Sequence, residues 1–172
     1  MSNFSIRLAR RGDTRPMAIM SRDLIETGLG WRWTPQRLEA SLRDRATNGL
    51  VATEGERIIG FALMKYLDDE AHLLLLAVRP ESRRAGVGRA LLNWLETSAL
   101  VAGIGSIELE VRVGSHAARV FYRQLGYQEL GLVPGYYGGR ETAMRMRHQF
   151  RVAADSKASF DATAVPVWRP SA

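Results

Sequence analysis

The chain has 172 residues, of which 46% are hydrophobic, and its formal net charge is +6. This length and composition suit one compact domain with a substantial core. The absence of cysteine excludes a disulfide framework, a thiol nucleophile and a cysteine-ligated zinc site. The basic charge predicts an anionic ligand or surface, and nucleic acid, a membrane and a polyanionic cofactor would all satisfy it.

Other features narrow these classes. The three histidines, His72, His116 and His148, lie on different predicted elements, so we expect no metal site. The longest apolar run, residues 73–78, is too short to span a bilayer, and the N-terminal stretch lacks an apolar signal core. The arginines are spread along the chain without a basic run. We therefore expect a cytoplasmic protein that binds neither membrane nor nucleic acid.

The first part of the chain predicts one strand followed by two helices. Residues 5–9 alternate apolar and polar side chains, as a short strand does. Asp13 is a suitable cap for a helix that ends before Gly28. A second helix begins at Thr34, and we expect it to end at Asn48, which precedes a glycine.

The middle of the chain changes from helical to alternating periodicity. Three antiparallel strands are predicted, at residues 50–53, 57–67 and 71–78. A helix with one apolar face follows and ends near Gly103. Residues 106–113 then alternate as a strand, which places Glu108, Glu110 and Arg112 on one face of the sheet.

The last predicted elements are a helix ended by Gly126 and two strands, at residues 127–132 and 142–148. The complete order is β-α-α-β-β-β-α-β-α-β-β, without internal repeats. This order predicts a mixed α/β domain built on one twisted sheet. We expect the domain to cover residues 1–150. Residues 151–172 lose periodicity and gain small residues and proline, as a C-terminal tail does.

A basic loop containing glycine lies at residues 79–92, with the sequence RPESRRAGVGRALL. It joins a strand to a helix start, where free backbone N–H groups and a partial positive charge favour a phosphate or pyrophosphate. No Lys-Ser/Thr pair follows Gly86 or Gly88, so the loop is not a P-loop, and Leu91 replaces the third glycine of the dinucleotide fingerprint. An ordinary structural connector remains the alternative.

Two motifs, in order, resemble the GNAT superfamily of N-acetyltransferases over about residues 6–147. The sequence RRAGVG at 83–88 matches the family's Gln/Arg-x-x-Gly-x-Gly/Ala pyrophosphate loop. The sequence SHAARVFYRQLGY at 115–127 is similar to the family's Asn-x-x-Ala-x-x-x-Tyr-x-x-x-Gly-Phe stretch. The resemblance implies the acyl-CoA N-acyltransferase fold: a single mixed, mostly antiparallel sheet flanked by helices, in a monomer or homodimer.

Within that superfamily the chain resembles the ribosomal-protein alanine N-acetyltransferases. The shared features are LEVR at 109–112, the tyrosine pair at 136–137 and the RETAMRM stretch at 140–146. In that branch the glutamate of Leu-Glu-Val-Arg is the general base and the helix tyrosine is the general acid. The resemblance therefore implies that Glu110 and Tyr122 are catalytic.

The resemblance also implies acetyl-CoA as the acetyl donor, without a metal. The matching cofactor-binding positions are Leu76, Ala77, Val78, Arg83, Arg84, Ala85, Gly86, Val87, Gly88, Arg89 and Ser115. Ser115 departs from the family, which has asparagine there. Its shorter side chain leaves one cofactor contact to water.

Each catalytic assignment has a structural alternative. A carboxyl with a pKa near 4.3 is a poor base at neutral pH unless burial or Glu108 raises it. The alternative for Glu110 is a solvated sheet face, where it pairs with Arg112. Tyr122 has the alternative of a core tyrosine on an apolar helix stripe.

The acceptor is less well specified. Trp31, Trp33, Tyr136 and Tyr137 lie in segments that flank the acceptor groove in this family, and we expect them to form its walls. The alternative for the tryptophans is a packing anchor between the first two helices. An α-amine, with a pKa of about 8, suits a modest base better than a lysine amine of about 10.4, so we favour a protein N-terminus. Acetyl transfer to a small-molecule amine and a catalytically silent acyl-CoA-binding module remain open.

Overall fold

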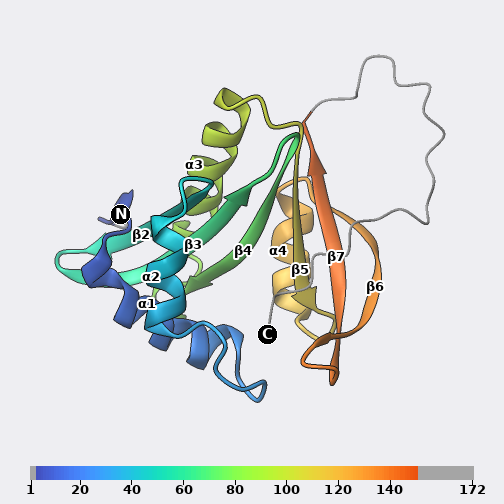
Figure 1. The fold of residues 1–172 in the computed structure, drawn as a ribbon, viewed down its shortest axis with the longest axis horizontal. Coiled ribbons are helices and arrows are strands. Elements are labelled where there is room, and N and C mark those ends of the chain that lie inside the picture. Colours follow the sequence, from blue (N-terminus) through green and yellow to red (C-terminus); the bar gives the residue numbers. More distant parts are fainter. Residues whose placement is uncertain (1–2, 151–172) are drawn as a thin grey trace.

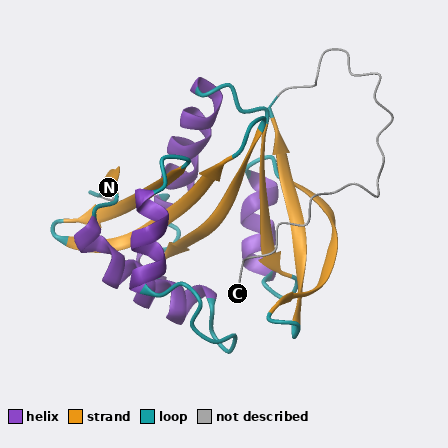
Figure 2. Cartoon of the chain, in the orientation of Figure 1, coloured by secondary structure: helices purple, strands orange, loops and turns teal. Residues whose placement is uncertain are grey.

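The computed structural model describes residues 3–150; the predicted tail at 151–172 lies outside the described residues. One twisted sheet of seven strands, in the order β1-β2-β3-β4-β5-β7-β6, forms the middle layer, and helices cover both faces (Figures 1 and 2). The strands are β1 (Ser5–Leu8), β2 (Thr47–Glu54), β3 (Arg57–Tyr66), β4 (Glu70–Val78), β5 (Ser106–Arg112), β6 (Gln128–Tyr137) and β7 (Glu141–Gln149). The α-helices are α1 (Thr14–Met20), α2 (Pro35–Arg43), α3 (Val87–Val101) and α4 (His116–Gln124). The shorter helices are η1 (Arg11–Asp13), the π-helical η2 (Ser21–Ile25) that continues α1, and η3 (Pro80–Ser82).

The sheet splits between β4 and β5. Every other neighbouring pair is antiparallel, whereas β4 and β5 are parallel and pair only from Glu70↔Ser106 to His72↔Glu108. Beyond His72 the two strands diverge, and Figure 1 shows the resulting V-shaped opening, with α4 beside it. The backbone of β4 along this edge therefore has no strand partner on the β5 side.

Each face of the sheet carries its own buried cluster. The cluster under α3 and α4 includes Leu91, Leu95, Ile107, Leu109 and Met146. The cluster under α1 and α2 includes Met17, Leu38, Phe61, Leu63 and Leu75. Because both faces are covered, β3 is buried along most of its length, and this explains why its sequence is almost continuously apolar.

The element order and the mixed, mostly antiparallel sheet are confirmed, but two predicted boundaries are wrong. The second helix ends at Arg43, and Asn48 and Gly49 lie inside β2. A Cβ on Gly49 would lie 2.3 Å from a methyl carbon of Leu42, so this glycine allows α2 to approach the strand and does not end a helix. The predicted loop after residue 132 is part of β6, which continues to Tyr137.

Candidate active site

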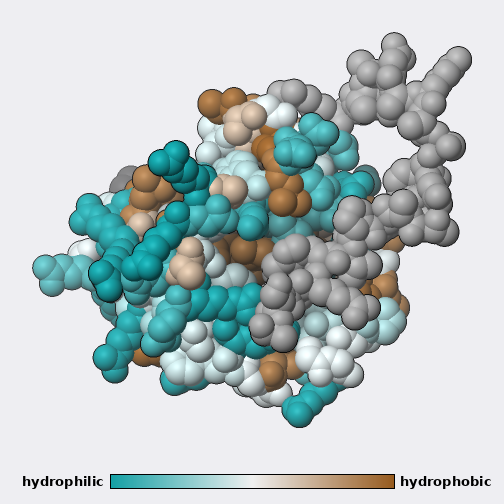
Figure 3. Space-filling model, viewed as in Figure 1, coloured by the Kyte–Doolittle hydropathy of each residue, from teal (hydrophilic) through white to brown (hydrophobic). Residues whose placement is uncertain are grey.

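The opening between β4 and β5 contains two adjoining cavities. One has a volume of about 200 Å³ and is lined by residues 73–76 of β4, residues 109–112 of β5, and Ser115, Ala118 and Tyr122 from the α4 side. The other, of about 90 Å³, lies toward α2 and shares residues 73–75, Glu110 and Tyr137 with the first. In the space-filling view, hydrophobic surface lies in a central hollow with hydrophilic side chains around it (Figure 3). We refer to the cavity of about 200 Å³ as the α4 cavity and to the cavity of about 90 Å³ as the α2 cavity.

The predicted phosphate loop forms a strained turn at the N-terminus of α3. Arg84 has φ 61° and Gly86 has φ 81°, so both residues are in the left-handed region. Gly86 is the N-cap residue and has no side chain to cap the helix, which leaves the first N–H groups of α3 available to a ligand. A Cβ on Gly88 would lie 3.3 Å from the Phe121 ring, so only a very small residue fits between α3 and α4.

The basic side chains of this loop divide into two groups. Arg79 and Arg83 donate to backbone carbonyls, Arg79 Nε to Ile58 O at 2.7 Å and Arg83 Nε to Val78 O at 3.1 Å. Arg84 and Arg89 are exposed, and no ion pair joins either to a carboxylate within residues 3–150. Arg83 is exposed as well, so three arginines carry the charge that faces solvent before and at the start of α3.

The remaining predicted cofactor positions contribute mainly backbone. Val87 is buried in the core, where its Cγ1 lies against Gly60, and Ala77 is also buried. Ala85 is exposed on the turn, and Leu76 lines the α4 cavity. Ser115 lines the same cavity at the N-cap of α4, with no hydrogen bond from its side chain to the helix.

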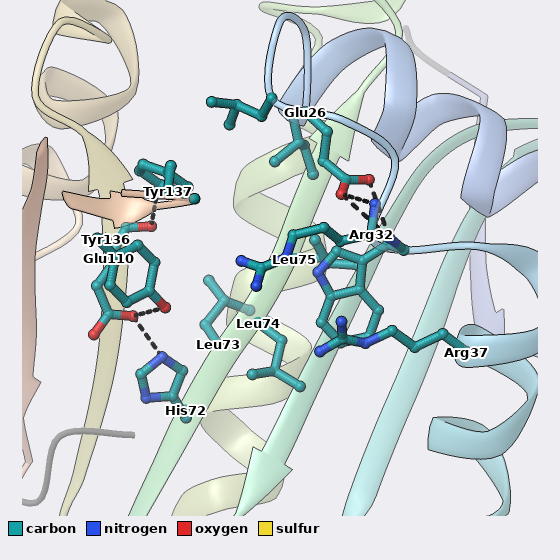
Figure 4. Close-up of a pocket in the computed structure, with 14 residues that line it drawn as sticks. Glu26, Arg32, Arg37, His72, Leu73, Leu74, Leu75, Glu110, Tyr136 and Tyr137 are labelled. Atoms are coloured by element: carbon teal, nitrogen blue, oxygen red, sulfur yellow. Dashed lines mark hydrogen bonds and ion pairs between the residues drawn. The ribbon is translucent and has the colours of Figure 1, made fainter. Parts of the chain in front are cut away.

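Glu110 lies on β5 where the strands separate, and its side chain is only 3% exposed. Its Oε2 lies 2.6 Å from Nε2 of His72, on β4, and accepts a hydrogen bond from the Tyr136 hydroxyl at 3.1 Å. Its Oε1 accepts from Nε of Arg145, on β7, at 3.0 Å. The interpretation of Glu110 as a solvated residue paired with Arg112 is therefore wrong. Figure 4 shows the carboxylate facing the α2 cavity beside His72 and Tyr136.

Burial opposes ionisation of Glu110, but the hydrogen bonds and positive charge of His72 and Arg145 outweigh it and hold the pKa of this carboxyl below its ordinary value. The condition under which this carboxyl would be a stronger base, a raised pKa, is therefore not met, although burial acts in that direction. Glu108 instead pairs with Arg147 on β7. Glu110 is therefore a carboxylate at neutral pH, oriented by three donor groups.

Arg112 crosses the open end of the site. Its guanidinium donates to Thr27 O at 2.6 Å and lies 3.6 Å from the Glu141 carboxylate. The same guanidinium lies 5.9 Å from the centre of the Tyr137 ring. Because Thr27 follows η2 and Arg112 ends β5, this contact joins the two sides of the V.

Tyr122, on α4, is 7% exposed and lines the α4 cavity. Its ring packs edge-on against Phe121 and Tyr127, with centroid distances of 5.1 and 5.5 Å. No residue in the described part of the chain forms a hydrogen bond with its hydroxyl. Burial, with a smaller contribution from Tyr137, raises the pKa of Tyr122, so the hydroxyl remains protonated at neutral pH. Tyr122 thus packs in the core, lines the α4 cavity and carries a hydroxyl with no hydrogen-bond partner among residues 3–150.

Three of the four predicted acceptor residues line the α2 cavity: Trp33, Tyr136 and Tyr137. Trp31 lines neither cavity. Its indole N–H donates to Ala18 O of α1 at 3.2 Å. This contact agrees with the alternative interpretation of Trp31 as a packing anchor. The pKa values of Tyr136 and Tyr137 are both raised, mainly by burial and secondly by the negative charge of Glu110.

Sequence reasoning missed His72, Arg145 and Glu26. Glu26 is 7% exposed and accepts from the backbone N–H groups of Arg32 and Trp33, at 2.7 and 3.2 Å, and from the Ser21 hydroxyl. It thereby fixes the loop that precedes α2. A histidine at the start of an otherwise apolar strand was the available signal for His72, but its partner is 38 residues away in sequence.

The side chains and helices of residues 3–150 indicate neither a metal site nor a membrane span. No group of three or more histidine and carboxylate side chains there is arranged to hold a metal ion. None of the helices in this part is both long and apolar enough to cross a membrane. The ionisable and hydroxyl side chains that line the two cavities include Glu110, His72 and Tyr122.

Comparisons with known proteins agree with the sequence resemblance. The model of the Acetyltransferase (GNAT) family matches residues 18–127. The [ribosomal protein bS18]-alanine N-acetyltransferase of Escherichia coli is 33% identical over 117 residues, which are 66% of this chain and 78% of that protein. An uncharacterised N-acetyltransferase of Methanocaldococcus jannaschii is 39% identical over 97 residues, and the match spans 56% of this chain and 62% of that protein.

The fold also matches solved structures. The crystal structure of the ribosomal-protein-S18-alanine N-acetyltransferase from Escherichia coli superposes with a TM-score of 0.75 and 26% identity, covering 89% of this chain and 97% of that chain. The chain therefore belongs to the Acetyltransferase (GNAT) family and is an N-acetyltransferase.

Proposed function

We propose that this enzyme transfers the acetyl group of acetyl-CoA to the α-amine of a protein N-terminus by direct attack. The observation that carries the proposal is the continuous opening between β4 and β5, with the Tyr122 hydroxyl on the α4 side and the Glu110–His72 pair on the α2 side. Donor and acceptor would enter from opposite sides and meet along residues 73–75, which line both cavities.

The donor would lie along β4 and the start of α3. The pyrophosphate would accept hydrogen bonds from the first N–H groups of α3, next to the exposed arginines Arg84 and Arg89. The edge of β4 beyond His72 is not paired with β5, and its backbone N–H groups could polarise the thioester carbonyl as negative charge builds. Ser115 supplies a short hydroxyl where the family has asparagine.

In the proposed reaction the neutral amine attacks the thioester carbon, a C–N bond forms, and the C–S bond breaks. The sulfur leaves as a thiolate, which Tyr122 would stabilise by donating its hydrogen bond. Because the pKa of Tyr122 is raised, complete proton transfer to a thiolate of pKa about 8.5 is uphill. Tyr122 therefore acts chiefly while charge develops, and solvent completes the protonation of the thiol.

The Glu110–His72 pair would receive the proton that the amine loses. A carboxylate with a lowered pKa is a weak base on its own. His72 Nε2 lies 2.6 Å from that carboxylate, so the pair can take up the amine proton and share it, directly or through a water molecule, when the imidazole is in its neutral form. Arg145 and Tyr136 hold the carboxylate in place.

The acceptor assignment rests on two considerations. The relatives named above include enzymes that act on the alanine of ribosomal protein bS18. An α-amine with a pKa of about 8 is neutral more often at pH 7 than a lysine amine of about 10.4, which suits a weak base. A ribosomal-protein acceptor would place the activity in the cytoplasm.

The test is CoA release from acetyl-CoA with a panel of peptides that differ in their N-terminal residue, with Nα-blocked lysine peptides and small amines beside them. We expect turnover only with peptides that have a free α-amine. Turnover confined to small amines would contradict the peptide assignment. Binding of acetyl-CoA without CoA release from any amine would identify a silent acyl-CoA-binding protein.

The turn before α3 provides a prediction for the donor side. Gly86→Ala is expected to destabilise the fold by about 1 kcal/mol, because a residue with a Cβ is disfavoured at φ 81°. It should also weaken binding of CoA several-fold. Urea unfolding and calorimetric titration with CoA measure the two effects. Gly12→Ala is the matched control, since Gly12 has neither a positive φ nor a neighbour within 4 Å of an added Cβ. Unchanged CoA affinity in Gly86→Ala would contradict the assignment of this turn.

A further inference from the structure

Two arginines lie on the wall of the α2 cavity opposite Glu110. Arg32 belongs to the loop before α2, and Arg37 is in the first turns of α2. Figure 4 shows both guanidinium groups directed toward Leu74 and Leu75, across the cavity from His72 and Tyr136. A substrate held against Glu110 would therefore have these two cations in front of it.

The position of Arg37 is fixed by an aromatic ring. Its guanidinium carbon lies 4.3 Å from the centre of the Trp33 ring, and the side chain is half-buried. A stacked guanidinium keeps its outer N–H groups free to form paired hydrogen bonds with a carboxylate. Trp33 thus acts as a platform that presents Arg37 to the cavity.

Neither guanidinium has a carboxylate partner within residues 3–150. Glu26 is the acid whose charge Arg37 experiences, but the Glu26 oxygens accept from Ser21 and from the backbone N–H groups of Arg32 and Trp33. The other acid of the cavity, Glu110, is already held by His72 and Arg145. Burial, and then the charge of Arg32, lowers the pKa of Arg37, which is the signature of a cation without a counterion.

We infer that Arg32 and Arg37 form an anion subsite that selects acceptors carrying a carboxylate close to the reacting amine. For a peptide, this carboxylate would belong to an aspartate or glutamate within the first few residues. A free amino acid would present the same chemistry through its α-carboxylate. The inference rests on the proposed function and narrows the class of its acceptor. Neither arginine belongs to the sequence motifs described above.

The experiment compares matched peptides that carry Asp or Asn, and Glu or Gln, at the second and third positions after a constant N-terminal residue. Free aspartate and glutamate form a separate arm. We expect kcat/KM to be about tenfold higher for the acidic member of a pair, mostly through KM, as is usual for one charge-assisted contact. The preference should weaken as salt is raised from low to physiological concentration.

Variants locate this preference. Arg37→Gln and Arg32→Gln should each reduce the ratio of acidic to amide turnover, and the double variant should bring it close to one. Arg37→Lys should keep part of the ratio, because it retains charge but loses the paired geometry. Arg22→Gln is the control: Arg22 pairs with Asp23, stacks on Trp31 and lines neither cavity, so its ratio should match the wild type.

The outcomes distinguish this inference from the proposed function. Equal turnover of acidic and amide peptides by an active wild-type enzyme would overturn the anion subsite and leave the proposed function intact. An acidic preference that persists in the double variant would also overturn it. No CoA release with any acceptor would instead overturn the proposed function. Acidic preference in peptides or in free amino acids supports the subsite, and the two arms show which kind of acceptor uses it.

Discussion

Replacing Glu110 with glutamine is expected to lower kcat/KM for peptide acceptors by about 10² or more, the usual contribution of a positioned acid or base. Glutamine has nearly the shape of the native side chain but cannot accept the proton of the amine. It also removes the negative charge that pairs with Arg145 and His72. Steady-state kinetics with a peptide that has a free α-amine measure the loss, and the affinity for acetyl-CoA should change less than twofold.

The pH dependence of the wild-type enzyme follows from the lowered pKa of Glu110. Because that pKa lies below the ordinary carboxyl range, Glu110 stays ionised from pH 5 to 8. The rise of kcat/KM with pH should therefore follow deprotonation of the acceptor's ammonium group. The midpoint of this rise should move when an acceptor with a different pKa is used. An inflection that stays fixed for every acceptor and disappears in Glu110→Gln would contradict this assignment.

The lowered pKa of Glu110 also makes the stability of the fold depend on pH. A carboxyl whose pKa is lower in the folded state stabilises the fold above its unfolded pKa, and this contribution is lost as pH falls through the folded pKa. The difference in unfolding free energy between wild type and Glu110→Gln should thus be largest near neutral pH and should shrink below about pH 4.5. Urea unfolding at several pH values tests this and identifies any loss of activity caused by misfolding.

Glu108→Gln is the matched control for Glu110→Gln. Glu108 lies two residues earlier on β5 and also pairs with an arginine of β7, Arg147, but it lines neither cavity. The Glu108→Gln variant should therefore be less stable than the wild type, without a loss of kcat comparable to that of Glu110→Gln. Equal losses of kcat in both variants would show that the effect comes from the ion pairs of the sheet and not from a base at residue 110.

Local sequence patterns predicted the order of elements because each element carries its own periodicity. They failed at Gly49, a residue of β2 where glycine makes room for Leu42 of α2. They also failed for the surroundings of Glu110. Alternation along β5 predicts which face Glu110 occupies, but whether that face is covered depends on the packing of distant segments.

Local patterns also predicted only part of the candidate site. The motifs identified the start of α3, Tyr122 and Glu110, because these have fixed spacings in the family. His72 and Arg145 reach Glu110 only through the register of β4 and β7 against β5, which no local pattern specifies. Arg32 lines the cavity on a loop that Glu26 holds, and Arg37, on α2, stacks on Trp33; neither contact belongs to the family motifs.

Tyr122→Phe is expected to lower kcat by about 10² to 10³ while leaving the fold as stable as the wild type. The hydroxyl has no hydrogen-bond partner among residues 3–150, so its removal breaks no contact within the described structure, and the ring keeps its packing against Phe121 and Tyr127. Single-turnover kinetics should show the loss in the chemical step, with acetyl-CoA affinity unchanged.

Tyr127→Phe supplies the opposite pattern as a control for Tyr122→Phe. The Tyr127 hydroxyl donates to Glu96 at 3.1 Å, and its ring lies in the same cluster but lines neither cavity. Its removal should cost about 1 kcal/mol of stability and leave kcat within about twofold. Tyr127 has a bonded hydroxyl and lines neither cavity, whereas Tyr122 lines the α4 cavity and its hydroxyl has no partner among residues 3–150, so the two variants separate catalysis from packing. A Tyr122→Phe enzyme with wild-type kcat would leave Tyr122 as a core residue and assign protonation of the sulfur to solvent.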